Sequence, residues 1–189
     1  MQGLPDVEVI APWPVLELLV DDFFTYIHPL APFPHEPTFR DSLVKREDRT
    51  NPDFLALMAS MLGMLVASFP RTVRLHLKAH NQIDMYPRAI AMVDRCRMVA
   101  LQARGAQFFN KPRATIYDAA TSYFLGLAAG YTLQWNVYRR FMNETWTFVR
   151  ELGIYGHSQP GIMYRGPPFN HIDDQIGKRI FWVMFLGVR

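Results

Sequence analysis

The sequence predicts an all-α protein, and two observations carry that prediction. Apolar residues recur with helical periodicity along the whole chain, and no Asn-Gly or Asp-Gly dipeptide joins alternating apolar runs, as a tight β-hairpin would require. Hydrophobic residues make up 50% of the 189 residues and charged residues 20%, which excludes the composition of a disordered chain. This length is sufficient for one domain with a sizeable core.

The first helix is predicted from Pro14 to about His28, after an N-terminal extension of residues 1–13. Proline suits the first position of a helix, and a set of apolar residues then recurs at helical spacing: Leu16, Leu19, Val20, Phe23, Phe24 and Ile27. Four prolines between His28 and Pro37 exclude a helix over that stretch. We therefore expect a packed, extended connection there.

The second helix is predicted to begin at Asn51 and Pro52 and to end at Pro70 and Arg71. Asparagine is a favourable N-cap, and residues 54–69 contain no charged side chain. These 16 residues are fewer than the roughly 20 that span a bilayer, so we expect a helix buried on all sides by protein. No membrane partner is predicted.

A third helix is predicted from about Asn81 or Pro87 to Gly105, with the arginines at 95, 97 and 104 directed toward solvent. One flank of this helix is expected to carry Ile90, Val93, Arg97 and Leu101. The next helix, over residues 115–135, has small residues that allow a neighbouring helix to approach closely: Ala119, Ala120, Gly126 and Gly130.

Two more helices complete the prediction. One covers residues 136–152 and ends at Gly153, a residue type that favours the turn after a helix. A loop rich in Gly and Pro follows over residues 156–168, and the last helix begins near Asp173. We expect an exposed apolar patch on this last helix, because no later helix covers Trp182, Phe185 and Leu186.

The charges are unevenly distributed. Residues 1–70 hold four Lys or Arg and ten Asp or Glu, whereas residues 71–113 hold nine and two. The basic segment could face nucleic acid or an acidic partner. Alternatively, it pairs with the acidic first third of the same fold, and we favour this alternative. The only aromatic residue between Arg71 and Arg104 is Tyr86, which disfavours a base-stacking surface for single strands.

The sequence contains no motif that predicts an enzyme, a catalytic residue or a metal site. His76 and His80 have the spacing of two metal ligands, but a third ligand is missing, so we interpret them as helix-flank histidines. His28 and His35 are expected to make local hydrogen bonds. The single cysteine, Cys96, excludes a zinc-thiolate cluster and is interpreted as a buried thiol.

Three stretches of the sequence together resemble the regulatory middle homology region of fungal zinc-cluster transcription factors, the domain also named for the xylanolytic activators. Residues 23–39 carry the most specific part of the signature, residues 146–155 resemble a helix end of the family, and residues 173–186 resemble a later helix. The matching residues are His28, Pro29, Phe33, His35, Pro37, Thr38, Phe39, Leu152, Gly153, Arg179, Phe181 and Trp182.

The resemblance implies a multi-helix superhelical array of antiparallel helices, incomplete at the C-terminus, with residues 14–189 forming the first part of the domain. It also implies a nuclear location and a role in regulating transcription by RNA polymerase II. In this family, DNA contact comes from an N-terminal cluster in which six cysteines hold two zinc ions. That cluster is missing from this chain, so we expect no cofactor here and DNA binding only through a separate segment.

The resemblance further suggests a small-molecule inducer, a homodimer or a co-regulator as partners. Four aromatic residues are candidates to line an inducer pocket, although we favour a role in the core for them: Tyr123, Tyr131, Trp135 and Trp146. The alternative function is a freestanding helical module that binds a ligand or another protein without contacting DNA.

Overall fold

The computed structural model describes residues 3–106, 108–154 and 171–187, and over these residues the protein is all-α with no strand. The helices are α1 (Trp13–Asp22), α2 (Glu36–Val44), α3 (Pro52–Ser68), α4 (Pro70–Ala79), α5 (Ala89–Arg104), α6 (Ile116–Tyr131), α7 (Trp135–Glu151) and α8 (His171–Gly187). Short 3₁₀ turns cover Val7–Val9, Glu47–Arg49, Ile83–Met85 and Phe108–Asn110. The fold class is therefore as predicted.

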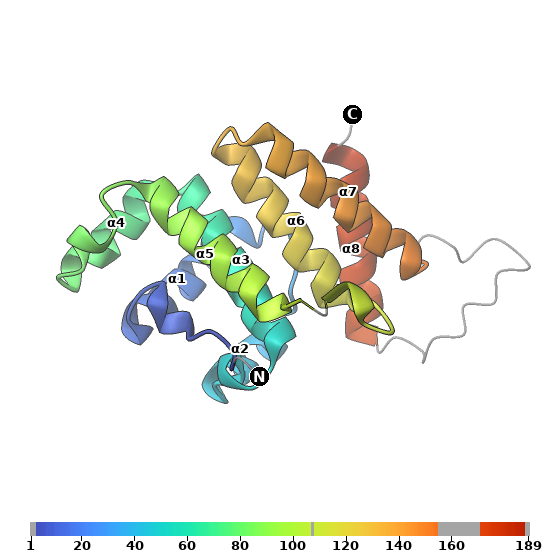
Figure 1. Ribbon diagram of the computed structural model, residues 1–189, viewed down its shortest axis with the longest axis horizontal. Helices are drawn as coiled ribbons and strands as arrows, with labels where there is room; N and C mark the ends of the chain where they lie inside the picture. Colours follow the sequence, from blue (N-terminus) through green and yellow to red (C-terminus); the bar gives the residue numbers. More distant parts are fainter. Residues whose placement is uncertain (1–2, 107, 155–170, 188–189) are drawn as a thin grey trace, which may run out of the picture.

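Helix α3 is the centre of the molecule. It packs against α5 on one side and α6 on the other, and α6 packs in turn against α7 (Figure 1). Every side chain from Phe54 to Val66 is buried, which confirms the prediction for this charge-free run. The N-cap is also as predicted, because the Asn51 side chain accepts hydrogen bonds from the amides of Asp53 and Phe54.

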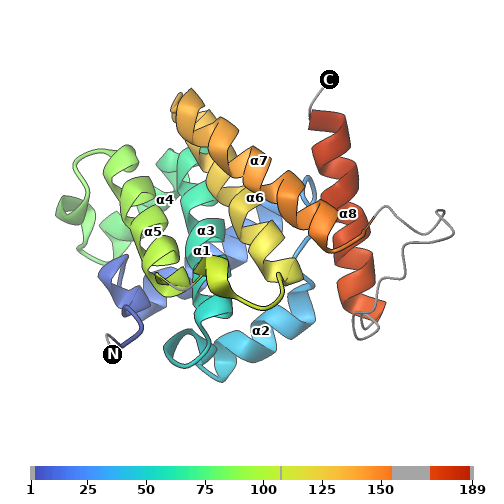
Figure 2. The same ribbon diagram turned by 45° about the vertical axis from the view of Figure 1, so that its right-hand side comes forward.

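The remaining helices surround this centre. Helix α8 lies along α6 and α7 at one edge of the fold, and α2 lies across the end where α3 begins (Figure 2). Residues Val7, Ile10 and Ala11, in the segment expected to be an extension, are almost fully buried and form part of the same core. The loop predicted over residues 156–168 lies outside the described residues.

Two helices were missed in the sequence. The prediction that prolines exclude a helix up to Pro37 is wrong at its end, because α2 starts at Glu36 with Pro37 in its first turn. Helix α4 begins at Pro70, which ends α3 and also opens the next helix, with a bend of 106° between the two axes. Proline is tolerated in the first turn of a helix because the amide there needs no partner.

The prediction for α5 is correct in extent but partly wrong in orientation. Its end is as expected, since Gly105 has φ +67°. Arg104, expected to face solvent, instead has a buried side chain that is only 4% accessible, and on the flank that carries Ile90 and Leu101 these two residues are exposed. The buried face is instead formed by Met92, Val93, Cys96, Val99, Ala100 and Ala103.

Helices α6 and α7 pack as closely as the small residues predicted. A Cβ added at Gly126 would lie 3.3 Å from the Cβ of Phe141 and would collide with the tip of Met142. A Cβ at Gly130 would lie 3.1 Å from the ring of Tyr138. Helix α7 ends at Glu151, and Gly153, two residues later, has φ +62°, which confirms the predicted turn after the helix.

Candidate functional site

The histidines of the first signature stretch make the local hydrogen bonds that were predicted. His28 Nε2 lies 2.9 Å from the carbonyl oxygen of Pro34, and His35 Nδ1 lies 2.8 Å from the hydroxyl of Thr38. These contacts tie together the two ends of the proline-rich connection, of which Pro29 is exposed. The histidines therefore have a structural role in shaping this connection.

Two of the four phenylalanines of the stretch, Phe33 and Phe39, anchor the segment to the core. Phe33 is fully buried against Tyr123 and Phe124 of α6, with ring centroids 5.4 and 5.1 Å away. Phe39 of α2 packs between Phe24 and Phe54. Burial of each of these two aromatic rings contributes about 2–3 kcal/mol to the stability of the fold. This contribution holds the proline-rich segment in place.

The third signature stretch contacts the first. Arg179 on α8 donates a hydrogen bond of 2.8 Å to the carbonyl oxygen of Pro32, 147 residues earlier in the chain. Phe181 packs edge to face against Trp146 of α7, while Trp182 is 57% exposed. The second stretch contributes Leu152, which is buried beside the turn at Gly153.

The four aromatic residues suggested for an inducer pocket have different environments. Tyr123 is buried, and burial raises its pKa to about 12. Trp146 is partly buried, whereas Tyr131 and Trp135 are exposed. None of these four lines any of the three cavities described below.

A cluster of charged residues at the junction of α5, α6 and α7 is a stronger candidate site. We call it the Arg104 cluster; its members are Asp53, Arg104, Lys111, Asp118, Ser122 and Glu144. Arg104 donates to Glu144 Oε1 at 2.6 Å, to the Ser122 hydroxyl at 2.7 Å and to the Asp118 carbonyl at 2.9 Å. Its guanidinium also lies 4.3 Å from the ring centroid of Phe108, within cation–π range.

The other half of the cluster is organised by Lys111. Its ammonium lies 2.8 Å from the carboxylate of Asp53 and 3.1 Å from that of Asp118. Asp118 is 4% accessible and also forms the capping box of α6 with Thr115, so helix geometry fixes its position. The cluster thus connects α3, α5, α6 and α7.

Burial and neighbouring carboxylates have opposite effects on the pKa values of Arg104 and Lys111 in this cluster. Burial lowers the pKa of Arg104 from its ordinary value, although Glu144 counteracts this change. Burial also disfavours the charged form of Lys111, but Asp53 and Asp118 outweigh it, so that the pKa of Lys111 is raised. Arg104 Nε has no hydrogen-bond partner within the described residues, which leaves one buried donor available.

A cavity of about 380 Å³ opens beside the Arg104 cluster. This volume lies within the range typical of sites for small molecules. Phe108 and Phe148 form apolar walls, and the ionisable lining residues are one ammonium and three carboxylates: Lys111, Asp118, Glu144 and Glu151. Since carboxylates and aromatic faces both attract cations, the cavity favours a ligand with an ammonium group or several hydrogen-bond donors.

Sequence reasoning missed this cluster because its members are far apart in the chain and match no motif. One signal was present: Arg104 follows Cys96 and Ala100 at intervals of four, so it shares the apolar face of α5. A charge on the buried face of a helix requires a partner. That requirement pointed to a polar cluster.

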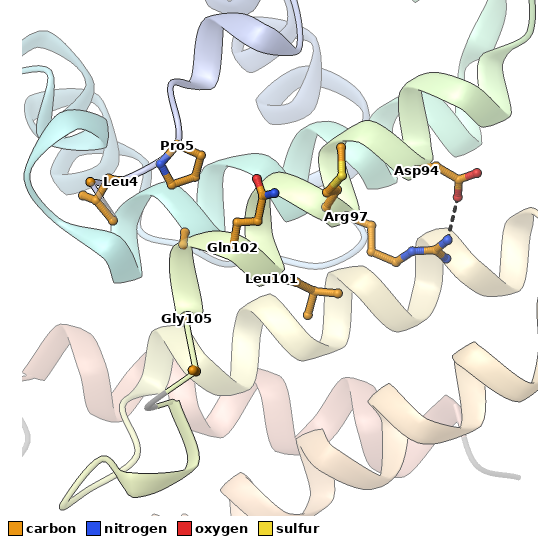
Figure 3. A pocket seen from close by; sticks show the side chains of 11 residues that line it. Leu4, Pro5, Asp94, Arg97, Leu101, Gln102 and Gly105 are labelled. Carbon is orange, nitrogen blue, oxygen red and sulfur yellow. Dashed lines mark hydrogen bonds and ion pairs between the residues drawn. The ribbon is translucent and has the colours of Figure 1, made fainter. Parts of the chain in front are cut away.

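A second hollow lies between the N-terminal segment and α5 (Figure 3). It is a wide, shallow groove of about 1040 Å³ that Leu4 and Pro5 border on one side. Arg97 donates to Asp94 at 2.7 Å and to Gln134 at 2.6 Å, so its guanidinium is engaged within the fold. The two charged residues that line the groove, Asp94 and Arg97, are therefore engaged within the fold.

The other candidate chemistry of the sequence has structural roles. His76 Nε2 lies 2.7 Å from Asp22, and His80 Nδ1 lies 3.0 Å from the carbonyl oxygen of His76, with no group of three potential metal ligands in the described ranges. Cys96 is buried, and burial raises its pKa to about 12. Among the described residues no single helix suits a membrane span by length and hydropathy; only the bent pair α3 and α4 passes when taken together.

Comparisons with known proteins give no match, whether with family models, with curated proteins or with solved structures.

Proposed function

We propose that the chain is a regulatory helical domain of a fungal zinc-cluster type transcription factor. It would act in the nucleus on transcription by RNA polymerase II, with DNA contact made by a separate zinc-cluster segment. The observation that carries this proposal is the hydrogen bond from Arg179 to the Pro32 carbonyl, which joins the first and third stretches of the resemblance. Three stretches in the family's order, with the third in contact with both the first and the second, support one structural unit.

The proposal is tested by transcription in living cells. Residues 1–189 are fused between a heterologous DNA-binding domain and a constitutive activation domain, and a reporter gene is measured. A regulatory domain changes reporter output relative to a fusion of equal length that carries an inert helical protein. Equal output from both fusions, at equal nuclear protein levels, contradicts the proposal.

A second candidate function, a helical ligand-binding module without DNA contact, is favoured by the cavity beside the Arg104 cluster. Its charge suggests hexylammonium as a probe and hexanoate as the matched anion. In a thermal unfolding experiment, hexylammonium at millimolar concentration is expected to raise the melting temperature, because ligands of the native state stabilise it by mass action. Hexanoate should have no effect. The Glu151→Gln variant, at an exposed lining position, should respond less to hexylammonium.

A further inference from the structure

The outward face of α4 carries a strip of exposed cations. Arg71, Arg74 and Lys78 are spaced by three and four residues, so they lie on one side of the helix, and all are exposed. Leu75 belongs to the same strip and is 66% exposed. None of the ion pairs within the described ranges involves these three cations, so the expected pairing with the acidic first third of the fold does not extend to them.

The opposite face of α4 fixes the direction of this strip. Val73 and Leu77 are buried, and His76 binds Asp22 at the end of α1. Six of the ten carboxylates in residues 1–70 are engaged by other partners: Asp21 and Glu36 by Arg40, Glu8 and Asp48 by Arg46, Asp53 by Lys111 and Asp22 by His76. Among the described residues, no carboxylate pairs with Arg71, Arg74 or Lys78, which leaves these cations for a partner outside the fold.

An apolar cavity of about 160 Å³ lies directly beside the strip, and Arg71 and Arg74 form part of its lining. Its apolar lining includes Val66, Val73, Leu77, Ile83, Tyr86 and Met92. This volume corresponds to about five water molecules at ~30 Å³ each, which suits one large side chain and is too small for a typical small-molecule ligand.

We propose that α4 and this cavity bind an acidic amphipathic peptide segment of a partner protein. One large apolar side chain of the peptide enters the cavity, and carboxylates on either side of it pair with Arg71, Arg74 and Lys78. The surface has a net positive charge, which complements the negative charge of an acidic peptide. Besides the three cations of α4, the connection from α4 to α5 contributes the cation Arg88 and a single carboxylate, Asp84. An apolar anchor surrounded by charge pairs is the usual pattern of helix-in-groove recognition.

Nucleic acid suits this surface less well. Single-stranded nucleic acid needs aromatic rings that are free to stack on bases. Tyr86, the aromatic residue in the lining of the cavity, is buried, and its hydroxyl donates to the carbonyl oxygen of Ile10 at 2.8 Å. The surface thus offers cations and an apolar cavity without a stacking platform.

The test uses a fluorescent peptide, about 16 residues long, with Asp and Glu flanking one central Leu. Binding to the 189-residue chain is followed by fluorescence anisotropy at low and physiological salt. We expect saturable binding that weakens with salt. The double variant Arg71→Glu/Arg74→Glu should weaken binding about tenfold, and replacing the peptide's Leu by Ala should weaken it by at least about tenfold.

Controls separate this interaction from general charge attraction. The double variant Arg139→Glu/Arg140→Glu changes the net charge equally on the exposed side of α7 and should bind the peptide as the unchanged protein does. Ala89→Trp, at an exposed position that lines the cavity, should reduce binding without lowering the melting temperature. Both results support the proposal.

Three outcomes overturn it. The peptide does not bind, or the α7 control variant loses as much affinity as the α4 variant. In the third outcome, vesicles of anionic phospholipid or a poly-dT strand bind in an Arg71- and Arg74-dependent manner while the peptide does not, which assigns the surface to a membrane or to nucleic acid.

Discussion

Arg104 is the residue on which the junction of α5, α6 and α7 depends. Replacing it by Met removes the cationic partner of Glu144, which then keeps only the Ser122 hydroxyl as a donor, and removes one donor to the Asp118 carbonyl. Breaking a buried ion pair in this way costs about 3 kcal/mol of unfolding free energy, because a charge stays buried without compensation. Urea denaturation of Arg104→Met measures this loss.

Arg97 on the same helix provides the control. It pairs with Asp94, whose side chain is 48% accessible, and donates to the neutral Gln134, and each of these two contacts contributes about 1 kcal/mol or less. Arg97→Met should therefore change the unfolding free energy only slightly. Equal losses for Arg97→Met and Arg104→Met would show that the Arg104 cluster has no special energetic role.

Tyr86 predicts a specific response to alkaline pH. Burial raises its pKa to about 12, above the value of about 10 in the unfolded chain. Between pH 10 and 12 the unfolded chain loses this proton and the folded chain keeps it, so stability falls as pH rises through that window. This contribution is fully present below pH 10.

The measurement compares the unfolding free energies of the unchanged protein and Tyr86→Phe at pH 9 and pH 11. Phenylalanine loses the hydrogen bond to Ile10, which costs about 1 kcal/mol at neutral pH, but it cannot ionise. The difference between the two proteins should shrink by about 1 kcal/mol from pH 9 to pH 11. A difference that is independent of pH would mean that Tyr86 titrates as it does in the unfolded chain.

At the scale of the elements, the contact between α6 and α7 depends on Gly126. Gly126→Leu places a side chain where Met142 and Phe141 already lie, and such overpacking costs about 1–3 kcal/mol. Adding Met142→Ala should restore part of the loss, because it empties the space that the leucine needs. Thermal unfolding of the two single variants and the double variant measures this coupling, and strictly additive losses would contradict the packing described.

The elements that sequence predicts best are those with strong local signals. Helix α3 combines an Asn51 cap, Pro52 at its first position and an uninterrupted apolar run, so its extent and burial follow directly. Helix α2 lacked such signals because it is short and mostly polar, and its first turn contains Pro37. Its position depends on Phe39 meeting Phe24 and Phe54, a tertiary contact that local periodicity does not encode.

The candidate sites were predicted less well than the helices, for the same reason. Glycines, caps and histidine hydrogen bonds act over a few residues, and these predictions are confirmed at Asn51, Gly153 and His28. The Arg104 cluster joins residues from Asp53 to Glu144, which only the packing of four helices brings together.

At the scale of the whole molecule, the C-terminal part of α8 exposes apolar side chains. Trp182, Phe185 and Leu186 are 57%, 41% and 66% exposed, as the sequence predicted for this helix. Exposed apolar patches bind partners or promote aggregation. The double variant Trp182→Gln/Leu186→Gln should therefore bind less hydrophobic dye and stay monomeric at higher concentration, with an unchanged melting temperature.

Dye fluorescence and light scattering of that variant test this patch. As a control, Leu30→Gln and Val44→Gln change exposed apolar residues elsewhere, at 75% and 84% exposure. If these control variants reduce dye binding as strongly, the surface of α8 is no more important than other exposed apolar residues.

The central claim is that this helical fold regulates a transcription factor of the zinc-cluster type. The most direct measurement is to sequence the complete messenger RNA that encodes the chain. We expect its reading frame to encode a six-cysteine zinc cluster on the N-terminal side of these residues and further helical sequence after Arg189. A complete reading frame without any such cluster would contradict the claim and favour a ligand-binding or interaction module.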